Sequence, residues 1–247
     1  DVRNPSKMEE VGRWWYPGTS EKDDAPPPDR INPDPIEELR GGDAFRLHNA
    51  NIYPSHPDRA YLGYIDGGAV ILDISNKSNP QVVSQWSPHN PYPGFTHTVL
   101  PLFDRGLLVV TDECIKDDGE DWPKLTWVID ARNEKNLVPI STLPLPSVDE
   151  FGNKGGRFGS HNLHENRPGP SFFSEEIIIG AFFNAGIRVY NLKNPYQPEL
   201  VAYFIPPGPI NSRVSTIQMN EVYVDENAIV YAGDRWAGGL YVMEMDI

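Results

Sequence analysis

The chain has 247 residues, of which 35 are Asp or Glu and 21 are Lys or Arg, and its formal net charge at pH 7 is −14. This acidic balance argues against nucleic acids and anionic membranes as partners, because binding to either depends on Lys and Arg side chains that neutralise phosphates. A single cysteine excludes a disulfide framework and a cysteine-rich zinc cluster, and no apolar run is long enough to span a bilayer.

The chain is rich in short runs of β-branched and aromatic residues that are bounded by turn-forming residues. Glycine and proline together make up close to a fifth of the sequence, and 39% of the residues are hydrophobic. Such runs predict strands separated by tight turns, and helical periodicity is almost absent. We therefore predict an all-β fold. In chain order, the predicted strands lie at 60–65, 69–74, 107–110, 125–129, 177–179, 187–190, 228–231 and 240–243.

The predicted strands recur as a repeated unit. In each copy a Gly-Gly or Ala-Gly turn precedes a strand that ends in an acidic or amide residue, and an Asn-Pro turn leads to a further strand. The clearest copies span 67–86 and 185–203, while 238–244 repeats the first half and 125–130 is a divergent copy. Repeats of about 40 to 50 residues with four strands each are typical of β-propeller blades. We predict four blades in one propeller domain, with the acidic or amide position at Asp1, Asp73, Asp130, Asn191 and Glu244.

The first interval of the repeat is the longest and contains a polar, proline-rich stretch at residues 19–42, which we interpret as a loop excursion. The repeat phase suggests two ways to complete a ring. Residues 11–15 could serve as the outer strand of the last blade, or further blades could come from an upstream portion or a companion chain. A ring of four blades is small for this architecture, so we favour the second interpretation. The 247 residues are then a portion of a larger propeller.

Two segments of the chain resemble the LVIVD-repeat proteins. They are residues 68–75, with the sequence GAVILDIS, and residues 184–203, which contain the run AGIRVYNLKNP. This family comprises bacterial β-propellers that are similar in architecture to selenium-binding protein, a methanethiol oxidase. The resemblance covers most of the chain apart from residues 19–42. It implies a seven-bladed ring and says little about the reaction.

Three of the six histidines occupy the same place in successive repeats. His48, His97 and His161 each begin the first strand of a blade. That strand is the innermost, so we expect the three imidazoles to converge near the propeller axis. Three imidazoles can bind a divalent transition metal and leave coordination positions open, although this ligation does not choose among Fe, Zn, Mn and Cu. The fourth blade offers Ser215 and Thr216 at this place and no histidine.

The other histidines and the cysteine are assigned lesser roles. His164 follows His161 by three residues, so strand alternation turns it to the opposite face, where it would act in the second shell or in substrate binding. His56 and His89 stand beside prolines and are interpreted as loop residues. Cys114 follows two acidic residues, which activate a thiolate poorly, and is interpreted as structural.

Acidic and amide residues recur in the turn between the second and third strands of each blade, which opens on the same face as the three histidines. For Asp66 and Asn184, turn chemistry alone explains the residue about as well as a functional role does. Glu113 adds a carboxylate that a turn does not require, so Glu113, with Asp112 beside it, is the predicted acid–base group. The residues predicted to act in the second shell or in substrate binding are Asp66, Asn184, Asp234 and Arg235, together with His164.

These residues favour a soluble metalloenzyme as the leading hypothesis. The metal would activate water, oxygen or a small organic substrate, with aromatic molecules among the candidates. An anionic group of the substrate could meet Arg157, Arg167, Arg188 or Arg235. The sequence does not distinguish a hydrolase, a lyase and an oxidoreductase. The alternative is a non-catalytic scaffold that binds a protein or a ligand across its face, and the compartment stays open, with the periplasm or secretion slightly favoured over the cytoplasm.

Overall fold

The structure, a computed structural model, describes residues 1–28, 45–89 and 91–246. Within these residues the chain folds into four antiparallel sheets. Helical structure in the described ranges is limited to α2 (Val148–Phe151) and the 3-10 turn η1 (Phe103–Arg105). The all-β prediction is therefore confirmed. No helix in the described part of the chain is long and apolar enough to cross a membrane.

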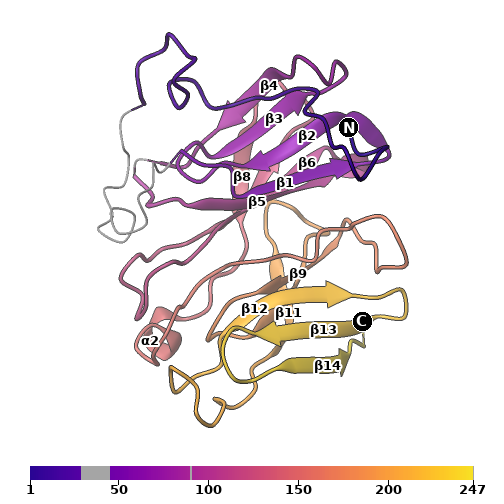
Figure 1. The fold of residues 1–247 in the computed structure, drawn as a ribbon. Coiled ribbons are helices and arrows are strands. Elements are labelled where there is room, and N and C mark those ends of the chain that lie inside the picture. Colours follow the sequence, from indigo (N-terminus) through magenta and orange to yellow (C-terminus); the bar gives the residue numbers. More distant parts are fainter. Residues whose placement is uncertain (29–44, 90, 247) are drawn as a thin grey trace.

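The first two sheets each contain four strands, and strands that are consecutive in the sequence are neighbours in the sheet. The first sheet consists of β1 (Asn49–Tyr53), β2 (His56–Gly63), β3 (Ala69–Asp73) and β4 (Gln81–Trp86). The second sheet consists of β5 (Thr96–Leu102), β6 (Leu107–Asp112), β7 (Thr126–Asp130) and β8 (Val138–Thr142). Strand β5 contacts β1 and β2, which brings the second sheet against the first (Figure 1).

The third and fourth sheets each contain three regular strands. The third sheet consists of β9 (Ile177–Ala181), β10 (Ile187–Asn191) and β11 (Glu199–Phe204), and the fourth of β12 (Met219–Val224), β13 (Ile229–Asp234) and β14 (Leu240–Glu244). Residues 161–164 add an irregular inner strand to the third sheet. There the Ala181 N–H donates to Asn162 O (2.8 Å), and the His164 N–H donates to Ile179 O (2.9 Å). The first and fourth sheets lie at opposite ends of the series in Figure 1.

The repeated unit makes the same turn hydrogen bond in successive copies. The side-chain oxygen of the acidic or amide residue accepts a hydrogen bond from the backbone N–H two residues later, as in an Asx turn. The pairs are Asp1 with Arg3 (3.0 Å), Asp73 with Ser75 (2.9 Å), Asp130 with Arg132 (3.0 Å) and Asn191 with Lys193 (2.8 Å). The glycine that precedes the strand takes a positive φ of 75° at Gly68 and 78° at Gly186. These turns depend on local sequence alone, which is why the repeat predicts the strands well.

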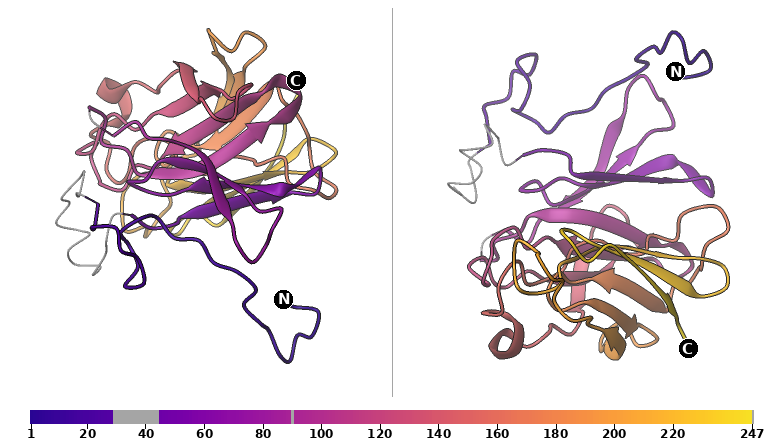
Figure 2. Two further views of the ribbon diagram at one scale, coloured as in Figure 1. Left: turned by 90° about the horizontal axis from the view of Figure 1, so that it is seen from above. Right: turned by 60° about the horizontal axis from the view of Figure 1, so that its bottom comes forward.

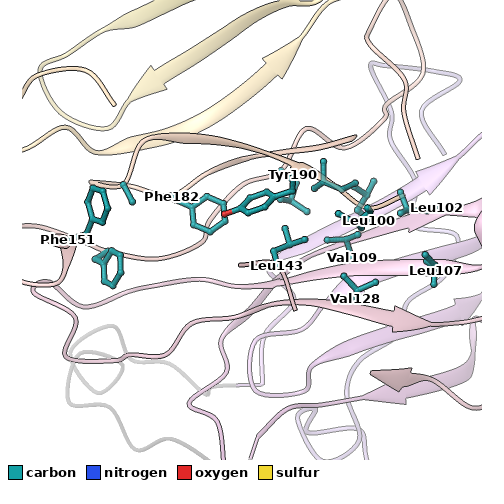
Figure 3. Packing of buried hydrophobic residues seen from close by; sticks show 14 residues of the cluster. Leu100, Leu102, Leu107, Val109, Val128, Leu143, Phe151, Phe182 and Tyr190 are labelled. Atoms are coloured by element: carbon teal, nitrogen blue, oxygen red, sulfur yellow. The ribbon is translucent and has the colours of Figure 1, made fainter. Parts of the chain in front are cut away.

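Apolar side chains fill the space between successive sheets. Ile71 of β3 and Val110 of β6 belong to the cluster between the first and second sheets. Val109, the neighbour of Val110 in β6, points the other way and belongs, as Phe182 does, to the cluster between the second and third sheets (Figure 3). A further cluster, which includes Val230 of β13, joins the third sheet to the fourth. Strand alternation thus gives each inner sheet two buried faces, as stacked blades require.

The N-terminal segment lies against the outer face of the first sheet. Residues 11–15 form no strand. Trp14 packs edge-on against Tyr64 with 5.5 Å between ring centroids, and Tyr16 stacks on Tyr64 at the same distance. The alternative in which residues 11–15 form the outer strand of the last sheet is therefore wrong, because these partly buried rings pack instead on the first sheet's apolar cluster.

The start of the chain, drawn in indigo in Figure 2, lies outside the sheets. Of the predicted loop excursion, residues 19–28 contain no helix or strand. The rest of that excursion, residues 29–42, lies outside the described residues.

Candidate metal centre

The three predicted histidines lie together at the inner strands of three successive sheets. His48 directly precedes β1, and its backbone N–H donates to Gly63 O of β2 (2.8 Å). His97 is the second residue of β5, and His161 begins the irregular inner strand of the third sheet. The ring centroids of His48 and His97 are 4.0 Å apart, and those of His97 and His161 are 4.6 Å apart. Equivalent positions in successive repeats therefore converge.

Glu113 directly follows β6 and places its carboxylate among the three rings. Its Oε2 is 3.6 Å from His48 Nε2 and 4.0 Å from His97 Nε2, and its Oε1 is 3.5 Å from His161 Nε2. These distances exceed those of hydrogen bonds. Two ligands that share a tetrahedral metal at about 2.0–2.2 Å lie about 3.4 Å apart, which is close to these values. The candidate ligand atoms of His48, His97 and Glu113 all lie within 4.8 Å of one another.

Surrounding groups hold the site residues in place. His161 Nδ1 is 2.8 Å from Asn220 O. Because a carbonyl can only accept, Nδ1 carries the proton, and the Nε2 of the neutral ring keeps a lone pair on the side of Glu113. A hydrogen bond of 2.6 Å joins His97 Nδ1 to Thr98 Oγ1. Such outer contacts orient imidazoles for metal binding in many metalloproteins.

The electrostatics of the site keep the imidazoles neutral. Burial, together with the two neighbouring imidazoles, lowers the pKa of His97 to about 2. Burial also lowers the pKa of His161 to about 3, and the pKa of His48 shifts in the same direction for the same reason. At neutral pH all three rings therefore offer lone pairs rather than positive charges.

Glu113 experiences two opposed effects. Burial raises the pKa of its carboxyl group, whereas the positive charge of Arg157 lowers it. Arg157 Nη1 donates to Glu113 Oε1 over 2.6 Å, and both side chains are largely buried. This ion pair fixes Oε1 and leaves Oε2 facing His48 and His97.

The site opens into a cleft of about 840 Å³ that is lined by residues of all four sheets and their loops. One wall is apolar and consists of Ile65, Phe95 and Ile115, which form a small buried cluster. Cationic side chains, including Arg157 and Arg235, also line the cleft. The site is thus accessible to a small molecule through a cleft that is apolar on one side and positively charged on another.

Asp112 lies beside Glu113 in the sequence but does not line the cleft. Its carboxylate accepts hydrogen bonds from Thr96 Oγ1 (3.0 Å) and Trp127 Nε1 (2.8 Å). Burial raises its pKa to about 6. Successive residues of a strand point to opposite faces, so Asp112 turns into the second sheet while Glu113 turns toward the axis. We therefore assign no catalytic role to Asp112.

The other predicted turn residues also lie outside the cleft lining. Asn184 Nδ2 donates to Phe151 O (3.0 Å), which ties its turn to α2. The carboxylate of Asp234 accepts backbone N–H bonds from residues 218, 236 and 238. Asp66 is buried in the turn between β2 and β3. The contacts of Asn184 and Asp234 therefore support a role in holding loops and turns.

His164 and Arg235 do line the cleft. Both ring nitrogens of His164 are engaged, because Nε2 donates to Phe172 O (2.6 Å) and Nδ1 accepts from the Val224 N–H (3.2 Å). His164 is therefore a hydrogen-bonding residue rather than a ligand. The guanidinium of Arg235 lies 5.9 Å from the centroid of the Phe183 ring.

The remaining residues singled out by sequence lie elsewhere. His56 stacks on Phe103, and His89 bonds to Ile65 O (3.1 Å), so neither reaches the three histidines. Cys114 is buried, its Sγ donates to Asp121, and burial raises the pKa of its thiol. The positions of His89 and Cys114 agree with the loop and structural roles predicted for them, whereas His56 begins strand β2 and is not a loop residue.

Two features of the site were missed by sequence reasoning. The ion pair between Arg157 and Glu113 links residues 44 positions apart, and only a Gly-Gly pair before Arg157 marks its loop. The carbonyl that orients His161 belongs to Asn220 of the fourth sheet. A backbone acceptor leaves no signal in side-chain identity, so no sequence pattern could have predicted it.

Comparison with known proteins supports the fold. Residues 58–87 match the family model of the LVIVD repeat. The chain is similar to the β-propeller domain of Cps50 (Swd1) from Myceliophteria thermophila, with a TM-score of 0.53 and 10% identity over 87% of this chain and 59% of that one. It is also similar to the computationally designed Ika4 protein, with a TM-score of 0.48 and 14% identity over 83% of this chain and 94% of that one. No curated protein matches the sequence.

The sheet arrangement and its structural relative define the chain as a β-propeller protein. Within that class it carries an LVIVD repeat, which spans β3 and β4 and most of β2. The resemblance stated from residues 68–75 is therefore confirmed. The similarity to selenium-binding protein and the size of the complete ring stay predictions.

Proposed function

We propose that this chain is a metal-dependent β-propeller enzyme that binds one divalent transition metal through His48, His97, His161 and Glu113. The observation that carries the proposal is the convergence of three Nε2 atoms on one buried carboxylate at distances of 3.5–4.0 Å. Imidazole and carboxylate ligands suit Zn, Fe, Mn and Cu, whereas Ca and Mg prefer oxygen ligands alone.

The donor set supports this assignment over a set of channel residues that are merely hydrogen-bonded. The Nε2 of His161 keeps its lone pair because Nδ1 donates to Asn220 O. Burial would penalise any of these rings that became charged, so the site favours neutral imidazoles. The distances favour Glu113 as a ligand over the acid–base role that the sequence suggested for it.

A metal at this position would supply Lewis-acid activation of water, oxygen or substrate. The chain's own contribution is to position the ligands and to shape the cleft. Arg157 anchors Glu113, and the apolar wall formed by Ile65, Phe95 and Ile115 excludes water from one side of the site. The substrate is a small organic molecule that enters the cleft of about 840 Å³. The reaction class stays open among hydrolase, lyase and oxidoreductase.

Elemental analysis of the natively purified protein tests the proposal. The wild-type chain should contain about one transition metal per molecule. His97→Ala should lose most of it while circular dichroism shows an unchanged β-fold, and His56→Ala, which removes an imidazole outside the site, should keep it. Absence of metal from the wild type, even after incubation with Zn²⁺, Fe²⁺, Mn²⁺ or Cu²⁺, would contradict the proposal and favour the non-catalytic scaffold.

A further inference from the structure

A second cavity adjoins the cleft of the candidate metal centre. It has a volume of about 410 Å³ and shares Ile115, Arg157 and Arg235 with the main cleft. Its other lining includes Arg213 and Trp236. Because three residues line both cavities, a ligand in the main cleft can extend into the second one past Arg157 and Arg235.

Three guanidinium groups lie along two aromatic rings at this junction. Arg157 lies 5.5 Å from the centroid of the Phe183 ring, and Arg235 lies 5.9 Å from it. On the other side, Arg235 is 5.8 Å and Arg213 is 5.1 Å from the Trp236 ring. Each cation–π contact attracts a guanidinium group to an aromatic ring. The like charges that are held near one another in this way repel each other, and a bound anion would reduce that repulsion.

The charge balance of the second cavity is positive although the chain is strongly acidic. Its lining contains Lys116 and the three arginines, against two carboxylates, Asp117 and Glu120. Arg157 is paired with Glu113, whereas Arg213 forms no ion pair within the described part of the chain. An acidic protein that gathers cations around a cavity provides a place for an anion.

The main cleft supplies a complementary apolar surface. Ile65, Phe95 and Ile115 form a buried apolar cluster, and Ile115 belongs to both cavities. A ligand with an apolar body against this cluster would therefore direct one end toward the metal centre and the other toward Arg213 and Arg235. Guanidinium groups bind carboxylates through paired N–H donors, which gives such an end a defined orientation.

We propose that the second cavity is the carboxylate-binding subsite of the enzyme, and that the substrate is a small organic acid with an apolar body. Arg213 and Arg235 bind the carboxylate, while the apolar wall of the main cleft binds the body. The role as a substrate subsite rests on the proposed metalloenzyme. Binding of the anion itself requires only these side chains and is expected in the metal-free and Zn²⁺-loaded protein alike.

The test uses phenylpropanoate and its uncharged amide as probes, with binding followed by NMR through the Trp236 indole N–H. Phenylpropanoate should shift this signal saturably, and the amide should bind at least about tenfold more weakly. Arg213→Gln and Arg235→Gln should each weaken the binding of phenylpropanoate by roughly tenfold. Arg132→Gln, which removes an exposed arginine paired with Asp130, should leave its binding unchanged. Arg213 is exposed, so its variant is expected to fold.

Metal content, measured on the same samples, separates this proposal from the previous one. The subsite is overturned if phenylpropanoate does not bind, if the amide binds equally well, or if both arginine variants keep the wild-type Kd, whatever the metal content. The protein could bind the carboxylate through both arginines and yet take up no metal. That result would support the anion site and contradict the proposal of a metalloenzyme.

Discussion

The hydroxyl group of Thr98 offers a sharp test of how the site is held, because it can be removed with little change of shape. Thr98 Oγ1 is 2.6 Å from His97 Nδ1, and Asn49 Nδ2 donates to it over 3.3 Å. When His97 binds a metal through Nε2, its Nδ1–H donates to this hydroxyl. Thr98→Val replaces the hydroxyl with a methyl group and removes the acceptor from both donors.

The expected magnitude follows from burial. Thr98 is fully buried and His97 nearly so, so the lost acceptor leaves a buried donor unpaired at a cost of about 1–3 kcal/mol. Loss of an orienting contact behind a metal-bound histidine typically weakens metal binding by about 10–100-fold. We therefore predict that Thr98→Val lowers the free energy of unfolding by about 2 kcal/mol and raises the Kd for Zn²⁺ by at least about tenfold.

The assays are urea unfolding and competition for Zn²⁺ against a chromophoric chelator. Thr126→Val is the matched control, because Thr126 is also fully buried but its Oγ1 has no hydrogen-bond partner within the described residues. The control should keep wild-type Zn²⁺ affinity and equal or greater stability. If Thr98→Val is destabilised like a lost hydrogen bond but binds Zn²⁺ as the wild type does, the contact with His97 does not orient a ligand and the reasoning fails.

Three further predictions concern the site and the core. Glu113→Gln removes the charge that pairs with Arg157 and one proposed metal ligand. Chelator competition should therefore show that Zn²⁺ affinity is reduced by more than about tenfold. Unchanged affinity would exclude Glu113 as a ligand. The pKa values of His97 and His161 in the folded protein, about 2 and 3, lie below the unfolded value of 6.5. Below pH 6.5 the unfolded chain therefore binds protons that the folded protein does not. The contribution of these histidines to the free energy of unfolding is complete above pH 6.5 and is lost as the pH falls toward about 3. In urea unfolding of the metal-free protein between about pH 6 and pH 4, His97→Gln should therefore reduce the slope of stability against pH by about 1.4 kcal/mol per unit, and an unaltered slope would count against a neutral buried His97. Tyr190→Phe removes a buried hydroxyl that donates to a backbone carbonyl over 3.1 Å, so urea unfolding should show a loss of about 1–2 kcal/mol with metal content intact, whereas wild-type stability would show the bond to be dispensable.

The fold was predictable because its repeat depends on local chemistry. Asp73 and Asn191 each accept a backbone hydrogen bond two residues later, and Gly68 and Gly186 take positive φ values, so the same short pattern produces the same turn wherever it occurs. The less favoured alternative for the N-terminal segment fails because its apolar residues resemble a strand, whereas Trp14 packs on the first sheet. Tertiary packing determines that choice, and the sequence carries no local sign of it.

The positions of the site residues were predictable to the extent that they follow the repeat. His48, His97 and His161 converge because equivalent positions of inner strands must meet at the axis. The pair Asp112 and Glu113 shows the limit of such predictions. Successive residues of a strand point to opposite faces, so the orientation of the strand decides which of the two carboxylates faces the cleft. The Trp127 indole that engages Asp112 comes from another strand. Contacts between strands thus set the details that residue identity leaves open.

X-ray absorption spectroscopy of the Zn²⁺-loaded protein tests the central claim most directly. The account predicts a first shell of nitrogen and oxygen atoms at about 2.0–2.2 Å, with the multiple-scattering signature of three imidazoles in the wild type and of two in His161→Ala. A shell without imidazole scattering, or a spectrum that is identical in the two proteins, would contradict a metal centre built from these histidines.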